Sequence, residues 1–162
     1  MTGAGLRIAS ALLLAGSTSS MAHTLPGPAS RAQSIAPAAR PPAAVVDAFH
    51  AALERGDTKA AAALLSEDVL IFEAGGAERS RAEYMAEHLP ADAEFSKATI
   101  AKVESRRGRV AGSLAWIASE GRTTGVFRGR QVNSRTTETM VLVRAGHSWK
   151  IAHIHWSSAP VR

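Results

Sequence analysis

The stretch that decides the fold is residues 149–160, WKIAHIHWSSAP. Its β-branched and aromatic residues are typical of a strand in a β-sheet. Side chains alternate between the two faces of a strand. One face is therefore predicted to carry Trp149, Ile151, His153 and His155, and the other Lys150, Ala152, Ile154 and Trp156.

Three further long strands are expected upstream, over residues 95–103, 110–120 and about 126–144. The turns between neighbouring strands are predicted at residues 106–108 and 145–147.

The first half of the chain has helical periodicity instead. Val46, Phe49 and Leu53 recur at helical spacing, and Gly56 is the expected C-cap. Asp57 is the expected N-cap of a second, alanine-rich helix.

A short apolar strand is then expected at residues 69–72. Ser80 and Glu83 form a capping box for a third helix, which is predicted to end near His88, before Pro90. Helices followed by a run of antiparallel strands predict an α+β domain, with a strongly bent antiparallel sheet wrapped around the N-terminal helices.

Together these segments resemble the nuclear transport factor 2-like superfamily. Residues 149–160 resemble its closing strand, residues 138–139 the preceding strand, and the pattern from Phe49 to Leu65 its opening helices. The resemblance is strongest to bacterial SnoaL-like proteins and to the association domain of calcium/calmodulin-dependent kinase. It covers nearly the whole of residues 42–162.

The resemblance implies a cone with a deep pocket between the first helices and the inner sheet face, in a homodimer that pairs sheet to sheet. In the kinase domain an arginine occupies the pocket position that Met140 holds here. Members of the superfamily include isomerases, dehydratases, cyclases and epoxide hydrolases, so the fold alone does not define a function.

The amino end has the features of a signal peptide over residues 1–22. Arg7 supplies the positive charge, residues 8–16 form a short apolar stretch, and residues 20–22 are a cleavage site. Residues 23–41, rich in proline and alanine, are expected to be a flexible linker. The protein is thus predicted to be periplasmic or secreted, and not membrane-bound after cleavage.

The formal net charge of +5 is unevenly distributed. Residues 42–94 hold four Lys/Arg against eleven Asp/Glu, whereas residues 95–162 hold twelve against three. Because no aromatic residues alternate with the arginines, we expect no nucleic-acid partner. The absence of cysteine excludes thiolate metal sites, disulfides and thiol chemistry.

Glu138 and Glu73 are the candidate acid or base. Glu138 shares a strand face with the apolar Met140 and Leu142, where burial raises a carboxylate pKa. The alternative for either glutamate is a structural pair with Arg135 or Arg122.

Tyr84 and His153 are the other candidate catalytic residues. His153 and His155, two positions apart, suit a general base or two metal ligands, but we expect no metal and no other cofactor. A structural role for both histidines stays open. The candidate ligand-binding residues are Glu73, Tyr84, His88, Trp116, Met140, His153 and His155.

These residues and the resemblance lead to two main hypotheses for the function and to a third possibility. The favoured one is an exported protein that binds a small, largely apolar molecule. The alternative is an isomerase, dehydratase or hydrolase that uses a pocket carboxylate with a histidine or tyrosine. A dimerisation or association module is the third.

Overall fold

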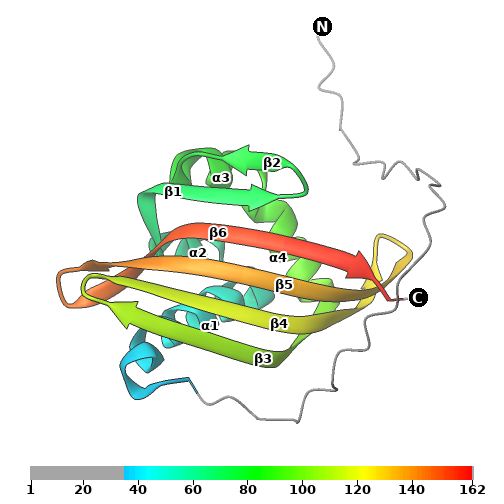
Figure 1. Ribbon diagram of the computed structural model, residues 1–162. Helices are drawn as coiled ribbons and strands as arrows, with labels where there is room; N and C mark the ends of the chain where they lie inside the picture. Colours follow the sequence, from blue (N-terminus) through cyan, green and yellow to red (C-terminus); the bar gives the residue numbers. More distant parts are fainter. Residues whose placement is uncertain (1–34, 162) are drawn as a thin grey trace, which may run out of the picture. The chain divides into compact units, whose positions relative to one another are not determined.

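Six strands form one sheet in the order β2-β1-β6-β5-β4-β3 (Figure 1). The computed structural model describes residues 35–161. The strands are β1 (Leu65–Glu73), β2 (Gly76–Glu78), β3 (Thr99–Ala111), β4 (Leu114–Phe127), β5 (Arg130–Ala145) and β6 (Ser148–Pro160). The predicted α+β class is confirmed, but the sheet is mixed, because β1 pairs parallel to β6.

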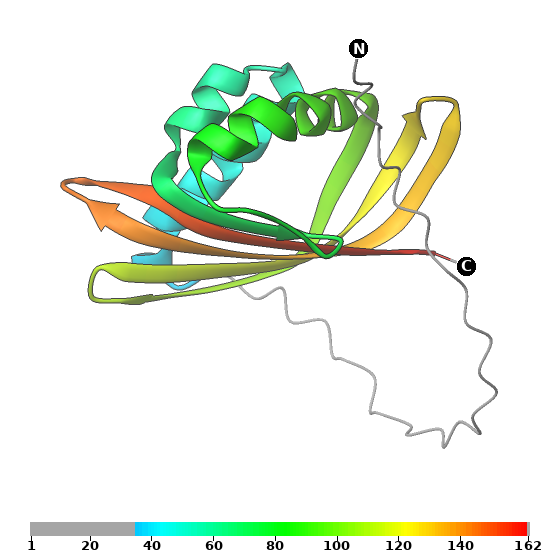
Figure 2. The same ribbon diagram turned by 90° about the horizontal axis from the view of Figure 1, so that it is seen from above.

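The helices all cover one face of this sheet (Figure 2). They are α1 (Arg40–Arg55), α2 (Thr58–Ala63), α3 (Arg81–Glu87) and α4 (Leu89–Ala98). The predicted caps are confirmed: Gly56 ends α1 with φ 72°, Asp57 accepts a hydrogen bond from the Ala60 amide, and Ser80 accepts one from the Glu83 amide. Only glycine adopts a positive φ without steric cost, which explains Gly56.

The packed region begins slightly upstream of residue 42. A short 3-10 helix, η1 (Pro37–Ala39), leads into α1, and Ala39 is fully buried. The predicted signal peptide at residues 1–22 and most of the predicted linker lie outside the described residues. None of the helices described is long and apolar enough to cross a membrane.

The third helix ends near His88, as predicted, but Pro90 then lies at the start of a further helix that was not predicted. It lies in the first turn of α4, where the missing amide hydrogen has no intrahelical partner to lose. Helix α4 therefore extends to Ala98, and the strand predicted from Phe95 begins at Thr99.

The turn predicted at residues 106–108 is also wrong, because β3 runs through them to Ala111. Gly108 is needed for packing, since a Cβ atom there would lie 2.5 Å from Cδ1 of Ile117. The hairpin turn lies instead at Gly112, whose φ is 61°.

The core lies between α1 and the inner sheet face. Val46, Phe49 and Leu53 on α1 are almost completely buried, as the helical periodicity predicted. They belong to one cluster with Ile117, Met140, Leu142, Ile151 and Ile154 from the sheet. Each such side chain contributes about 1.5–3 kcal/mol to folding, so this cluster fixes α1 against the strands.

Candidate functional site

A pocket of about 390 Å³ lies between the inner sheet face and helices α1 and α4. Figure 2 shows why there is space for it: the β4–β5 hairpin curls toward the helix side of the sheet. Phe127 of β4 packs edge-to-face against Phe95 of α4, with ring centroids 5.3 Å apart. Apolar wall residues include Ala51, Leu53, Phe95, Val103, Val132 and Trp156.

Polar side chains cross the inner sheet face in one row. Glu73 on β1 is opposite Trp156 on β6, and Trp156 is opposite Glu138 on β5. Glu138 is opposite Ser119 on β4, which is opposite Arg106 on β3. All five line the pocket. With neighbouring strands about 4.8 Å apart, the row spans about 19 Å.

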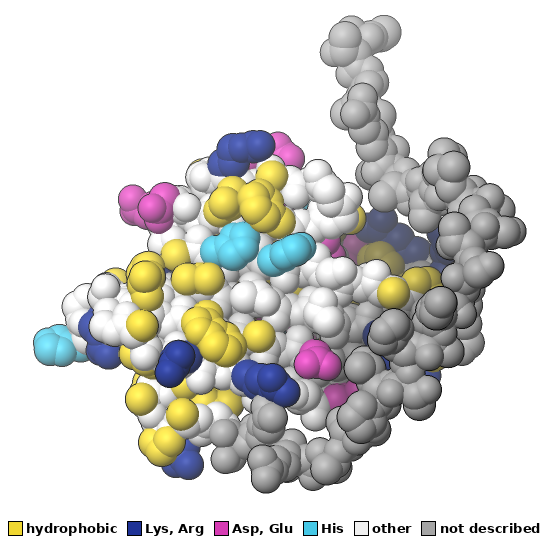
Figure 3. Space-filling view, viewed as in Figure 1, with side chains coloured by type: hydrophobic (Ala, Val, Ile, Leu, Met, Phe, Trp, Pro, Cys, Tyr) yellow, Lys and Arg dark blue, Asp and Glu magenta, His cyan; other side chains and the backbone are white. Residues whose placement is uncertain are grey.

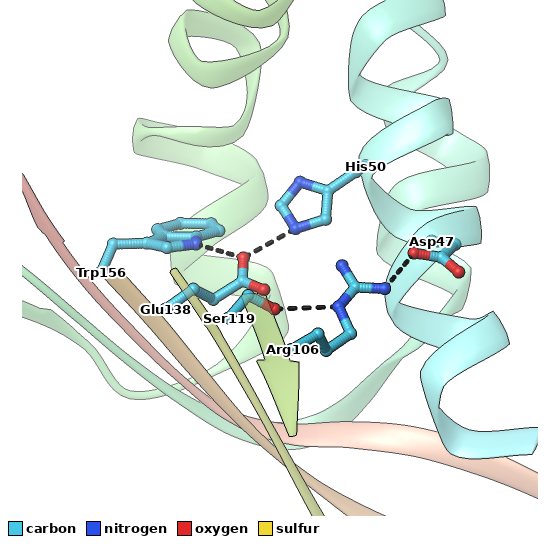
Figure 4. Close-up of polar contacts among 6 residues, drawn as sticks. All are labelled: Asp47, His50, Arg106, Ser119, Glu138 and Trp156. Atoms are coloured by element: carbon cyan, nitrogen blue, oxygen red, sulfur yellow. Dashed lines mark hydrogen bonds and ion pairs between the residues drawn. The ribbon is translucent and has the colours of Figure 1, made fainter. Parts of the chain in front are cut away.

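Glu138 is held by two donors in the middle of this row (Figure 4). Its Oε2 accepts hydrogen bonds from Nε1 of Trp156 at 2.8 Å and from Nε2 of His50 at 2.6 Å. Its side chain is only 10% exposed. Burial raises the pKa of Glu138, but the His50 hydrogen bond and charge, the Trp156 hydrogen bond and the Arg106 charge outweigh burial and lower the pKa overall.

Glu138 is therefore an ionised, hydrogen-bonded carboxylate. Within residues 35–161 its hydrogen-bond and ion-pair partners are His50 and Trp156, and not Arg135 or Arg122, the structural partners considered from the sequence. The prediction that Glu138 shares an inner face with Met140 and Leu142 is confirmed, since both are fully buried on that side of β5. A lowered pKa makes it an acceptor of hydrogen bonds and a poor proton donor at neutral pH.

Arg106 contacts both the sheet and helix α1, which form two walls of the pocket. Its Nε donates to Oγ of Ser119 at 3.0 Å, and its Nη1 pairs with Asp47 of α1. The side chain of Arg106 is 13% exposed. It thus links β3 to β4 and to α1 at one end of the row.

Glu73 lies at the other end of the row and has the opposite electrostatics. Although the residue is exposed, the atoms packed around its carboxylate remove part of its hydration and raise its pKa to about 7. This value includes the smaller upward effects of the Asp92 and Glu78 charges and the downward effect of His88. A group with a pKa near neutrality can both take up and release a proton.

Tyr84 and His88 contact the two acidic residues, Asp92 and Glu78, that lie near Glu73. The fully buried Tyr84 donates its hydroxyl hydrogen to Oδ2 of Asp92 at 2.7 Å, and Nδ1 of His88 pairs with the buried Glu78. Asp92 lines the pocket, whereas Tyr84 and His88 do not. Burial raises the pKa of Asp92 even though Tyr84 and His88 lower it.

The placement predicted for His153 is wrong. Strand β6 has a bulge at Ala152, because Val141 is opposite His153 whereas Leu142 is opposite Ile151. The extra residue reverses the alternation, so Ile154 and Trp156 point inward with Ile151. His153 instead bonds through Nδ1 to the Leu70 carbonyl at 2.8 Å.

His155 and Trp116 also do not line the pocket and are exposed on the outer sheet face. Phe72 packs edge-to-face against both His153 and His155, with centroids 5.3 and 6.4 Å away. Trp116 is 41% exposed there. Met140 is inward but buried beneath the pocket, and does not line it.

The sequence analysis missed His50, Arg106 and Asp92. The signal for His50 is present: Asp47, His50 and Glu54 recur at helical spacing along the flank of the apolar stripe of α1. Arg106 was missed because residues 106–108 were predicted to form a turn, whereas they belong to β3. Within residues 35–161, no group of three or more His, Asp or Glu side chains is arranged to hold a metal ion.

Comparison with known proteins assigns the family. The model of the SnoaL-like domain matches residues 43–162. A proposed ketosteroid isomerase from Shewanella frigidimarina is 33% identical, with a TM-score of 0.72 over 76% of this chain and 100% of its own. No curated protein matches the sequence at a significant level.

Two more distant structures share the fold. A proposed calcium/calmodulin-dependent protein kinase II association domain from Xanthomonas campestris is 22% identical, with a TM-score of 0.65 over 78% of this chain and 93% of its own. A proposed dehydratase of the NTF2-like family from Streptomyces avermitilis is 18% identical, with a TM-score of 0.62 over 75% of this chain and 94% of its own.

Proposed function

This chain belongs to the SnoaL-like domain family, and on that premise we propose that it binds a small, largely apolar molecule in the pocket under α1. The observation that carries the proposal is the pocket itself, with apolar and aromatic walls and one row of polar side chains. Ligand sites combine apolar walls with a few fixed polar groups in this way.

The test is binding of a neutral apolar dye, N-phenyl-1-naphthylamine, measured by its fluorescence. Ala101 lines the pocket from β3, so Ala101→Trp should fill it and weaken dye binding at least ten-fold. Ala111→Trp, at an exposed position of the same strand outside the pocket, is the matched control. Equal affinities of the wild type and both variants would contradict binding in this pocket.

Proton transfer is the second candidate function, favoured by Glu73. Its pKa of about 7 suits a general acid or base, and the 33% identical relative is a proposed ketosteroid isomerase. We expect the protein to exchange the acidic C–H hydrogens of a ketosteroid for deuterium in D2O, as measured by mass spectrometry. Glu73→Gln should abolish the exchange and Glu87→Gln, on α3, should not. The exchange activity is refuted if the wild type shows no more exchange than the buffer.

The outer sheet face supports a homodimer. Phe72, Trp116 and Leu114 are 39%, 41% and 49% exposed on it, and Figure 3 shows hydrophobic and histidine side chains side by side there. Exposed apolar groups gathered on one face mark interaction sites. The sedimentation test of this proposal is described in the Discussion.

Export to the periplasm or medium remains a proposal from residues 1–22, which lie outside the described residues. Mass spectrometry of the protein recovered from expressing bacteria should find a chain that begins at His23. A cytoplasmic chain that retains Met1 would refute it.

A further inference from the structure

We infer that Nδ1 of His50 is the pocket atom that accepts a hydrogen bond from the ligand, and that the ligand carries an O–H or N–H donor on its apolar body. The inference rests on the proposed function, because it needs a ligand in the pocket. It assigns a role to a residue of α1 that the sequence analysis did not name.

The hydrogen bonds of Glu138 define the tautomer of His50. Oε2 of Glu138 belongs to an ionised carboxylate, which can only accept hydrogen bonds. Nε2 of His50, 2.6 Å away, must then carry the hydrogen. In the imidazolium both nitrogens would carry a hydrogen, so we assign the neutral ring to the ligand-binding form, in which Nδ1 keeps its lone pair and is an acceptor.

Nδ1 is also free to meet a ligand. His50 lines the pocket, and its side chain is 34% exposed. Within residues 35–161 no hydrogen bond involves this nitrogen, whereas Nε2 has a short one. A ligand donor is therefore the group that completes the hydrogen bonding of this ring.

Glu138 and Trp156 are positioning residues in this arrangement. The Trp156 indole fixes the carboxylate through its 2.8 Å hydrogen bond, and its ring stacks on the buried Phe49 with centroids 6.3 Å apart. Phe49 also packs edge-to-face against His50, at 5.8 Å. The orientation of the imidazole is thus set by packing as well as by hydrogen bonding.

The same geometry accommodates a proton transfer. If the ligand O–H or N–H bond breaks, the proton moves to Nδ1 and the electron pair stays on the ligand heteroatom. Figure 4 shows the Arg106 guanidinium between Glu138, His50 and Asp47, where its charge would stabilise that anion. Glu138 would stabilise the imidazolium formed on His50.

The experiment is nitrogen NMR of the 15N-labelled full-length chain, titrated with indole or with 1-methylindole. Before titration, the His50 signals should show a protonated Nε2 and an unprotonated Nδ1. Indole should shift the Nδ1 signal, and 1-methylindole, which lacks the N–H donor, should not. By dye displacement, indole should bind roughly five-fold more tightly than 1-methylindole, and His50→Leu should remove the difference.

Two outcomes would overturn the inference: a proton on Nδ1 in the free protein, or the same response of Nδ1 to both compounds. Glu138→Gln should lose the single tautomer, and if that variant does not fold, Trp156→Phe provides the same test through the carboxylate. Failure of the dye to bind would refute the proposed function. Normal dye binding with no indole response at Nδ1 would refute only this inference.

Discussion

At the scale of single residues, Glu138 and Glu73 are two glutamates on the same sheet row with opposite acid–base behaviour. Glu138 is buried but has two hydrogen-bond donors and a nearby guanidinium, so its pKa falls. The atoms packed around the Glu73 carboxylate remove part of its hydration, and the charges of Asp92 and Glu78 act in the same direction, so its pKa rises. Loss of hydration raises the pKa of both carboxylates, and the hydrogen-bond donors and the guanidinium found only beside Glu138 reverse its effect there.

Glu138→Gln should destabilise the protein by about 1–3 kcal/mol at neutral pH, because it removes a charged acceptor shared by two partly buried donors. The pKa of Glu138 is lower in the folded than in the unfolded state, so its contribution is present above the ordinary value of 4.5 and is lost as the pH falls through the folded value. Urea unfolding across the acid range measures this. A difference between variant and wild type that does not shrink at low pH would contradict the assignment.

Glu73→Gln should have the opposite pH signature. The pKa of Glu73 rises from 4.5 to about 7 on folding, so wild-type stability should fall as the pH rises through that window. The glutamine variant lacks this loss and should gain relative to the wild type above about 7. Denaturant unfolding at both ends of the window checks the sign, and a constant difference would refute it.

The sequence analysis located Glu138 and Glu73 among the carboxylates that line the pocket, but not the residues that contact them. Glu138 and Glu73 could be found because a carboxylate among strand apolar residues departs from the local pattern. His50 is distant from Glu138 along the chain, and only the packing of α1 on β5 brings the two together. A contact between residues so far apart in the chain cannot be inferred from the local periodicity of the sequence.

At the scale of secondary-structure elements, single-residue irregularities determine which side chains reach the pocket. The residues of β6 were predicted as a strand correctly, yet the bulge at Ala152 reverses the face of every residue after it. The sequence therefore predicts that these residues form a strand. Which of their side chains face the pocket depends on a register shift, and the alternation of residue types does not reveal it. Pro90 is a similar case, since a helix end and a helix start both tolerate proline.

Gly121→Ala tests the close approach of β3 and β4 at the pocket wall. A Cβ atom there would lie 2.4 Å from the Lys102 carbonyl oxygen, so the backbone must move. We expect a loss of more than about 2 kcal/mol and weaker dye binding. Gly112→Ala, at a turn with open space around it, should cost only the left-handed strain of about 1 kcal/mol. Equal losses in thermal unfolding would refute the steric explanation.

At the scale of the whole molecule, charge and exposed apolar surface are separated. The acidic residues 42–94 supply most of helices α1 to α4 and four of the carboxylates that line the pocket, Asp47, Glu54, Glu73 and Asp92. Residues 95–162 supply the other two, Glu120 and Glu138. The basic second half supplies the long strands, and their outer face carries the exposed Trp116 and Leu114. The division seen in the sequence thus has a spatial counterpart.

Trp116→Glu should convert the proposed homodimer to a monomer, because it buries a carboxylate in an apolar interface. Sedimentation velocity at micromolar concentration measures the change, and dye binding should be retained since Trp116 lies outside the pocket. Ala91→Glu, at an exposed position of α4 on the other side of the sheet, introduces the same single charge and is the control. A wild-type monomer would contradict the dimer.

The parallel pairing of β1 with β6 has a consequence for the order in which the chain can fold. The last strand to be synthesised lies inside the sheet, between β1 and β5, so the β1–β2 pair has no place in the sheet until residue 160 is available. Contacts between such distant segments form late, because the loop between them must close first. A growing or truncated chain that lacks β6 would expose the edges of β1 and β5 together. The sheet, and with it the hydrogen bond from Trp156 to Glu138, can therefore assemble only after β6 has been synthesised.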